Sequence, residues 1–372
     1  MFVNHTNYSD ICAVNDPYDF LRYCAISLTS LLSLGGTVTN LLLVYAFYNL
    51  TKRERYKTHY LYFILLTVLD VGGCLSYALI YGLDAQVLYF RSKMLFDLYF
   101  TLLEPVYTLS RVVRFSIPYI ILLATFEKWL CTSFRLASTC FSRSVCSERG
   151  RIVLTLSVCT SAMLLRLPTA WTVQVKHFEQ CADYFGSKQL SHTDLAFDYT
   201  YSFFDFYVLG ALEVFAPFLL LVPLNYAILR NMSTGRLYCL KVSTGHLFLM
   251  TIRASQIGNN KEFSAARIIP DTELSEVEVE QERMAQRTVE TAVAVIMLVS
   301  SYLLCTAPSF VLSVLEKSYI SLLVDEEGNS RTFYRTWADV VSSLFVLNCF
   351  LEPIILWACN QQLRDEIRIT IT

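Results

Sequence analysis

Charged residues are scarce in this chain. They make up 17% of its 372 residues, whereas soluble globular domains carry about 25%. The formal net charge is only −2, so there is no surplus of positive charge for binding a nucleic acid, and we expect no such partner. Histidine is also scarce, and all 5 histidines fall in loops or at the ends of apolar segments. This placement argues against a buried histidine zinc site and against an enzyme that depends on one.

Two familiar patterns are also missing. Residues 1–22 lack the succession of basic, apolar and small residues that marks a signal peptide, so we expect the first apolar segment to act as its own insertion signal. No internal repeat is visible, although transporters often consist of duplicated halves. A transporter or channel therefore fits poorly, and it is the main alternative from another class of protein.

The chain is instead rich in long apolar segments. Hydrophobic residues make up 54% of the sequence and aromatic residues 14%. A helix needs about 20 mostly apolar residues to cross a bilayer, and seven segments meet this requirement. The sequence predicts an all-α membrane protein, a seven-transmembrane helix bundle with a short amphipathic eighth helix. The predicted spans are 25–49, 58–82, 103–131, 152–173, 204–229, 288–315 and 334–358.

Basic residues set the expected orientation. Most of them lie in the loops after the first, third and fifth spans, and the positive-inside rule assigns such loops to the cytoplasm. The N-terminus is then extracellular and the C-terminus cytoplasmic. We expect the protein to lie in the plasma membrane. Two glycosylation acceptors, Asn4 and Asn7, agree with this orientation.

This orientation divides the chain into three parts. Residues 1–24 form the extracellular N-terminus, residues 25–358 form the bundle, and residues 359–372 form an amphipathic helix on the inner leaflet with a short tail. The long third cytoplasmic loop covers residues 230–287. Its acidic run is either a solvated extension of the sixth helix or a regulatory contact surface.

Polar residues inside the apolar spans point to function. Nearly every span carries a proline or an ionisable residue near its middle. A charge at membrane depth costs about 2.5–3.5 kcal/mol on insertion scales, so such residues usually face a protein interior and mark a binding site or a pathway. The sequence therefore predicts a protein that binds or moves something between its helices.

A first polar cluster is expected near the extracellular end. Four residues of the third span recur at steps of three and four and share one helix face; they are Glu104, Tyr107, Arg111 and Arg114. The two arginines need anionic partners, and the candidates are Glu104, Glu213 and Asp339. The cluster is either an internal ion-pair network or a polar site for a charged ligand. A ligand that competes for the same partners would make it both.

A second cluster is expected near the middle of the membrane. Asp70 and Glu352 lie on spans that would pack together, close to Asn40 and Asn348. Their oxygen atoms suit a hard cation such as sodium. Alternatively, one of the two carboxyl groups is protonated, or the four residues only form hydrogen bonds within the bundle. We expect no other metal and no cofactor.

A third cluster is expected near the cytoplasmic end. Glu127 and Lys128 are adjacent in the third span. They either extend to the lipid head groups or form a polar cluster that holds the third and sixth helices together. Pro308 removes a backbone hydrogen bond in the sixth helix and predicts a hinge there.

Three of the 12 cysteines fall in segments that we expect outside the cell. They are Cys12, Cys24 and Cys181. An oxidising compartment would allow two of them to form a disulfide.

Several short motifs follow one another along the spans. They are Gly36-Thr37-Val38-Thr39-Asn40, Leu66-Thr67-Val68-Leu69-Asp70, Glu127-Lys128-Trp129, Cys305-Thr306-Ala307-Pro308, Asn348 with Glu352-Pro353-Ile354-Ile355-Leu356, and Leu363-Arg364. In order and spacing they resemble the GxxxN, LxxxD, D/E-R-Y, CWxP, N…NPxxY and F-R motifs of rhodopsin-like (class A) G-protein-coupled receptors. The chain departs from these motifs at Lys128, Thr306, Glu352 and Leu356, and no cysteine begins its third span.

The resemblance implies a receptor and not an enzyme. Its partners would be an extracellular ligand, membrane lipids and a heterotrimeric G protein. It assigns the signalling switch to Glu127, Lys128, Pro308, Glu352 and Pro353. No lysine occurs in residues 334–358, which argues against a retinal-binding opsin.

One tract suggests a ligand class. The segment from Leu164 to Trp171 resembles the end of the fourth span in invertebrate FMRFamide-type neuropeptide receptors, which implies a peptide ligand such as an amidated Arg-Phe peptide. The arginine of that peptide would seek the three carboxylates named above, whereas Arg111 and Arg114 would suit a ligand carboxylate. A chemosensory receptor for a small molecule and a receptor that does not signal are the alternatives within the family.

Overall fold

The computed structural model describes residues 19–53, 60–132, 144–178, 181, 183–230, 271–318 and 332–371. Within these residues, seven helices are long and apolar enough to cross a membrane. They are Phe20–Lys52, Leu61–Phe90, Lys93–Leu130, Glu148–Trp171, Tyr199–Arg230, Glu290–Leu315 and Phe333–Cys359. The chain is therefore a multi-pass membrane protein, and the predicted helical fold with seven spans is confirmed.

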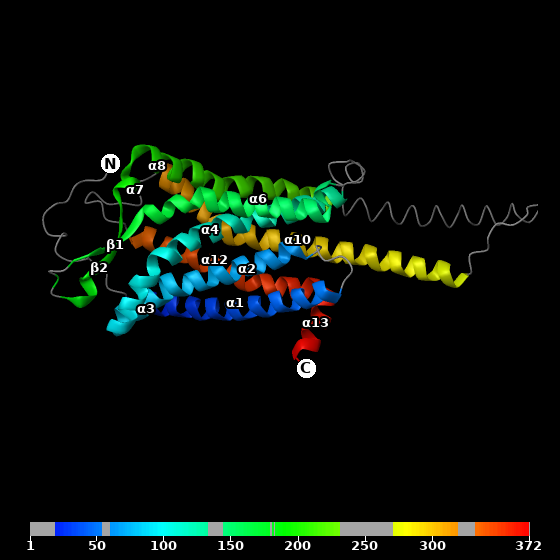
Figure 1. The fold of residues 1–372 in the computed structure, drawn as a ribbon, viewed down its shortest axis with the longest axis horizontal. Helices are drawn as coiled ribbons and strands as arrows, with labels where there is room; N and C mark the ends of the chain where they lie inside the picture. Colours follow the sequence, from blue (N-terminus) through cyan, green and yellow to red (C-terminus); the bar gives the residue numbers. More distant parts are fainter. Residues whose placement is uncertain are drawn as a thin grey trace, which may run out of the picture.

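The spans run side by side as a bundle (Figure 1). The helices that form it are α1 (Phe20–Arg53), α2 (Leu61–Tyr77), α3 (Leu83–Phe90), α4 (Lys93–Thr132), α6 (Glu148–Arg166), α10 (Asp271–Ser318) and α12 (Thr332–Cys359), with the short helix α13 (Gln361–Ile371) after them. Helix α1 begins at the end that carries the strands β1 and β2, and α12 ends next to α13 at the opposite end (Figure 1). We call these the hairpin end and the α13 end.

The fifth span is not a regular α-helix. It begins with α8 (Tyr199–Phe203) and continues through two π-helical segments, η4 (Phe204–Leu209) and η5 (Ala211–Phe215), before an α-helix over 216–230. A shorter π-helical segment, η1 (Ala78–Gly82), lies between α2 and α3. Such segments are rare and are frequently found at functional sites. In the fifth span they lie where Asp205 and Glu213 project into the bundle.

A small sheet covers the hairpin end, which a purely helical expectation missed. Strands β1 (Val173–His177) and β2 (Lys188–His192) pair antiparallel. They follow the 3₁₀ helix η2 (Leu167–Trp171) and enclose η3 (Tyr184–Gly186), and the short helix α7 (Asp194–Phe197) leads on to the fifth span. Five residues per strand are too few to give a clear alternating pattern in the sequence.

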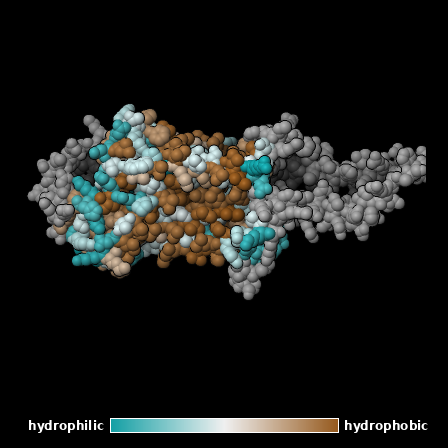
Figure 2. Space-filling view, in the orientation of Figure 1, coloured by the Kyte–Doolittle hydropathy of each residue, from teal (hydrophilic) through white to brown (hydrophobic). Residues whose placement is uncertain are grey.

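The surface of the described residues suits a bilayer. Hydrophobic residues form a belt around the bundle, and hydrophilic residues gather at its two ends (Figure 2). Leu31 and Leu219 on this surface are 66% and 65% exposed, whereas Phe47 and Ile120 in the core are fully buried. Without lipid around the belt, this much exposed apolar surface would be unusual for a monomer.

Two glycines let helices approach closely in the core. A Cβ atom on Gly36 of α1 would lie 3.0 Å from Sγ of Cys74 on α2, and a Cβ atom on Gly73 would lie 3.0 Å from the ring of Phe345 on α12. Helix packing inside membranes relies on such small residues. They bring α1, α2 and α12 together around the central polar residues described below.

Two elements define the α13 end. Helix α10 is continuous from Asp271 to Ser318, and its first part projects beyond the bundle (Figure 1). The acidic run therefore belongs to a helical extension of the sixth span, as one of the two interpretations predicted. The short helix α13 starts where Oδ1 of Asn360 accepts a hydrogen bond from the Leu363 amide (3.1 Å), and Leu363 is fully buried against the bundle.

Candidate functional site

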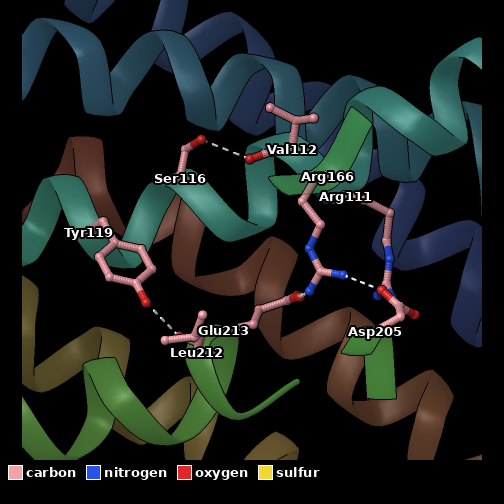
Figure 3. A network of polar contacts seen from close by, with 8 residues as sticks. All are labelled: Arg111, Val112, Ser116, Tyr119, Arg166, Asp205, Leu212 and Glu213. Atoms are coloured by element: carbon pink, nitrogen blue, oxygen red, sulfur yellow. Dashed lines mark hydrogen bonds and ion pairs between the residues drawn. The ribbon is translucent and has the colours of Figure 1, made fainter. Parts of the chain in front are cut away.

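The most deeply buried cation of the described residues is Arg166. It ends α6, and its side chain is 1% exposed. Its Nη1 donates a hydrogen bond to Oδ1 of Asp205 (2.8 Å), and its Nη2 pairs with Oε2 of Glu213 (Figure 3). The guanidinium carbon also lies 5.4 Å from the centre of the Phe115 ring on α4. One side chain thus ties α6 to the fifth span and to α4.

Arg111 on α4 joins this cluster from the other side. Both arginines point toward Asp205 (Figure 3), but Nη2 of Arg111 is 3.9 Å from Oδ2 of Asp205, beyond hydrogen-bond distance. Tyr107 and Glu213 also act electrostatically on Arg111. The prediction that Tyr107, Arg111 and Glu213 share one polar region at this end agrees with the geometry, although Glu213 bonds to Arg166 and not to Arg111.

Two residues of this region were missed from the sequence. Arg166 and Asp205 were not selected as site residues, although each is an ionisable residue within an apolar segment. That signal was available for both. What the sequence could not give is the pairing, because Arg166 and Asp205 lie 39 residues apart and their contact depends on the path of the loop between them.

The other expected partners of Arg111 and Arg114 bind different groups. Oε1 of Glu104 accepts a hydrogen bond from the Val175 amide of β1 (2.6 Å), so it holds the sheet against α4. Oδ2 of Asp339 on α12 pairs with Nε of Arg22 on α1 (2.8 Å). The guanidinium of Arg114 lies over the Phe345 ring, 4.8 Å from its centre. Neither Glu104 nor Asp339 is therefore the direct partner of Arg111 or Arg114.

The residues of the predicted central polar cluster lie close to one another. Its four residues are all at most 2% exposed; they are Asn40, Asp70, Asn348 and Glu352. Nδ2 of Asn348 donates to Oε1 of Glu352 (2.8 Å), and Oγ of Ser301 on α10 donates to Oδ1 of Asn348 (3.2 Å). Asp70 and Glu352 interact electrostatically with each other. The cluster thus joins α2, α10 and α12.

This cluster has more acceptors than donors. Four buried oxygen atoms have no hydrogen-bond partner among the described residues: Oδ1 of Asn40, both carboxylate oxygens of Asp70, and Oε2 of Glu352. Buried oxygens without a partner are costly, and a cation or a shared proton would satisfy them. These four oxygen atoms suit sodium, which prefers oxygen ligands. No group of three or more His, Cys, Asp or Glu side chains in the described part of the chain is arranged to hold a metal ion.

A third set of polar contacts lies at the α13 end. Glu127 of α4 accepts two hydrogen bonds from Arg151 of α6, at 2.9 Å from Nε and 2.7 Å from Nη2, and both side chains are buried. The neighbouring Lys128 donates from Nζ to Oγ1 of Thr291 on α10 (3.2 Å). The two residues therefore bind different neighbours, and Lys128 makes the expected link between the third and sixth spans.

The prolines of the predicted switch lie inside continuous helices. Pro308 interrupts the hydrogen bonds of α10, and its own carbonyl accepts a hydrogen bond from Nε1 of Trp337 on α12 (3.1 Å). Pro353 follows the buried Glu352 within α12. Each proline removes one backbone hydrogen bond of its helix, so the helix bends more easily at that point.

The cysteine prediction is corrected in part. Cys181 is disulfide-bonded, whereas Cys24 is an exposed free cysteine. Cys24 is therefore not its partner. The third candidate, Cys12, lies outside the described residues, as do the glycosylation acceptors Asn4 and Asn7.

The three polar sets thus lie along one bundle, and α4 takes part at both of its ends. Comparison with known proteins adds no family to this description: no protein-family model matches the chain, and no curated protein matches it either. The chain is a seven-helix membrane protein with buried polar clusters between its spans.

Proposed function

We propose that this protein is a G-protein-coupled receptor that binds an extracellular ligand at the hairpin end. One observation carries the proposal. Helix α4 contributes Arg111 to the polar region at the hairpin end and Lys128 to the contact with α10 at the α13 end. A ligand that changes the first contact can therefore shift the same helix at the second.

The two contacts at the α13 end differ in strength, which suggests how the switch works. The pair of Glu127 and Arg151 is buried and bidentate, and such charge-assisted bonds are the strong ones. Lys128 donates one hydrogen bond to Thr291, and a hydrogen bond to a neutral hydroxyl contributes only about 0.5–1.5 kcal/mol. Ligand binding would leave α4 attached to α6 and release the inner half of α10, which bends at Pro308. This is a shift between two packings of the bundle.

The released crevice would accept a heterotrimeric G protein at the α13 end. In this proposal that end is cytoplasmic, in agreement with the basic loops that follow the first, third and fifth spans. Lys128 would then offer its charge to the G protein once Thr291 has moved away. The central cluster, with its excess of oxygen atoms, lies between the two ends and would bind sodium in the resting packing.

The ligand that we propose is a peptide. The two-stranded sheet β1–β2 lies at this end, and an RFamide-like peptide is the specific candidate from the sequence. Its arginine would have to displace Arg166 from Asp205 or Glu213, since both carboxylates are already paired.

The experiment is a screen of cells that express this chain, with a second-messenger readout and a peptide library containing amidated and free-acid members. A response that depends on the expressed chain supports the receptor. Lys128→Ala should then reduce the response while surface expression stays unchanged. A ligand-dependent ion flux without any second-messenger response would instead support a transporter or channel.

A further inference from the structure

The polar region at the hairpin end has too few carboxylates for its arginines. Three arginines of α4 and α6 lie at or next to it: Arg111, Arg114 and Arg166. Among the described residues, the carboxylates that act on Arg111 or pair with Arg166 are Asp205 and Glu213, and Arg166 binds both. The other two candidate carboxylates bind other groups. Glu104 accepts a hydrogen bond from the Val175 amide of β1, and Asp339 pairs with Arg22.

Arg111 keeps its donors unused. Among the described residues no acceptor lies within hydrogen-bond distance of it, and its nearest carboxylate oxygen is 3.9 Å away. Its Nε is buried without a partner, yet the side chain as a whole is 32% exposed. A guanidinium carries five N–H donors in a planar fork that matches a carboxylate. Arg111 is therefore partly accessible and forms no hydrogen bond among the described residues, although Asp205 and Glu213 attract it.

Arg114 is the second unsatisfied cation. It lies three residues after Arg111, so the two Cβ atoms are about 5–6 Å apart on one face of α4. The face of its guanidinium is covered by the Phe345 ring of α12, a contact that leaves the donors at the edge of the group free. Arg111 extends toward the fifth span, and Arg114 extends toward α12.

We propose that Arg111 and Arg114 bind a carboxylate of the ligand, carried by the free C-terminus of a peptide or by a small organic acid. This inference rests on the proposed receptor function. The ligand group that it names is a negative carboxylate, whereas an amidated Arg-Phe peptide would bring a positive arginine. Arg166 is a positioning residue here, because it takes the short contacts of Asp205 and Glu213 and leaves Arg111 only their longer-range attraction. The ligand anion supplies the missing partner of the two arginines on α4.

The test uses the full-length protein, purified in detergent, and matched pairs of probes. One pair is N-acetyl-phenylalanine and its carboxamide; the other is a tetrapeptide ending in phenylalanine with a free or an amidated C-terminus. Because hydrogen bonds to charged groups contribute about 1.5–3 kcal/mol, the acid of at least one pair should bind at least about tenfold more tightly than its amide. Binding is measured by the shift in unfolding temperature across a concentration series.

Variants identify the site. Arg111→Gln and Arg114→Gln should each abolish the preference for the acid, and Arg111→Lys should keep part of it because the charge remains. Arg91→Gln is the matched control, since Arg91 pairs with Asp183 on the exposed rim of the same end and should leave the preference unchanged.

The possible failures are distinguishable. Equal or tighter binding of the amides, or no binding of either acid, overturns the proposal even if amidated peptides activate the receptor in cells. Acid binding that depends on Arg111 supports the carboxylate site even where the probe triggers no second messenger, because the receptor function is tested separately by the peptide screen. An acid preference that survives in Arg111→Gln places the anion elsewhere and also overturns the proposal.

Discussion

At the scale of single residues, burial separates the ion pairs that matter from those on the rim. The pair of Arg151 with Glu127 and the pairs of Arg166 lie inside the bundle, whereas Arg91 and Asp183 are more than half exposed. A buried charge that loses its partner cannot turn to solvent, so removing one member is far more damaging inside than outside. The stability of this protein should therefore depend on few charged residues.

Arg166→Ala is the direct test of this difference. The substitution leaves two partly buried carboxylates, 30% and 17% exposed, without their guanidinium partner, and we expect it to destabilise the protein by about 1.5–3 kcal/mol, the contribution of hydrogen bonds to charged groups. Thermal unfolding of the purified protein measures the effect. Arg91→Ala is the control, for which the loss should stay below about 1 kcal/mol. Similar losses in both variants would show that Asp205 and Glu213 do not need the guanidinium.

A second prediction at this scale concerns the central oxygen cluster. If its unpartnered oxygens bind sodium, replacing a potassium salt by a sodium salt at equal ionic strength should raise the unfolding temperature by a few degrees, because a ligand of the native state stabilises it. Asp70→Asn should remove this response, while Asn225→Ala, which changes an amide outside the cluster, should keep it. An unfolding temperature that is the same in both salts would favour a shared proton.

At the scale of elements, the predicted helices were easier to derive than their contacts. Long apolar segments are set by composition alone, so all seven spans were predictable; the largest difference is at the start of the third span, predicted at 103 and found at Lys93. The π-helical turns of the second and fifth spans leave no mark in hydropathy. The sheet was missed because short strands in a polar loop lack a periodic signal.

The candidate site was predictable only in part, and for a similar reason. Helical spacing placed Glu104, Tyr107, Arg111 and Arg114 on one face of α4, which needs no knowledge of other helices. Which carboxylate meets which arginine depends on helix rotation, and no spacing rule gives that. This is why Asp339 was expected near the α4 arginines but instead pairs with Arg22 at the start of α1.

The contact between α4 and α10 leads to a prediction at this scale. Thr291→Val keeps the volume of the side chain but removes the hydroxyl that accepts a hydrogen bond from Lys128. Loss of one hydrogen bond of about 1 kcal/mol changes a two-state equilibrium about fivefold, so we expect second-messenger production without ligand to rise by up to that factor. Thr39→Val is the control, because the Thr39 hydroxyl bonds only to backbone carbonyls of its own helix. Basal signalling that is unchanged in Thr291→Val would remove this contact from the switch.

At the scale of the whole molecule, an odd number of spans, seven in the described residues, places the chain before the first span and the chain after the last span on opposite sides of the membrane. An epitope tag before residue 1 should bind antibody on intact cells, and a tag after residue 372 should bind only after the cells are made permeable. The positive-inside rule is the physical reason, since basic loops resist transfer across the membrane. A reversed pattern would put the hairpin end in the cytoplasm, and a ligand from outside could not reach Arg111.

The buried Arg166 also has a consequence for biosynthesis. The ribosome makes α6 before the fifth span, and Asp205 and Glu213 follow Arg166 by 39 and 47 residues. At about 5–20 residues per second, the nascent fourth span waits several seconds with an uncompensated guanidinium, which would cost about 2.5–3.5 kcal/mol at the centre of a span and less near its end, where Arg166 lies. Its integration by the translocon should therefore be incomplete until the fifth span arrives, and truncation of the nascent chain before Asp205 should leave the fourth span partly outside the bilayer.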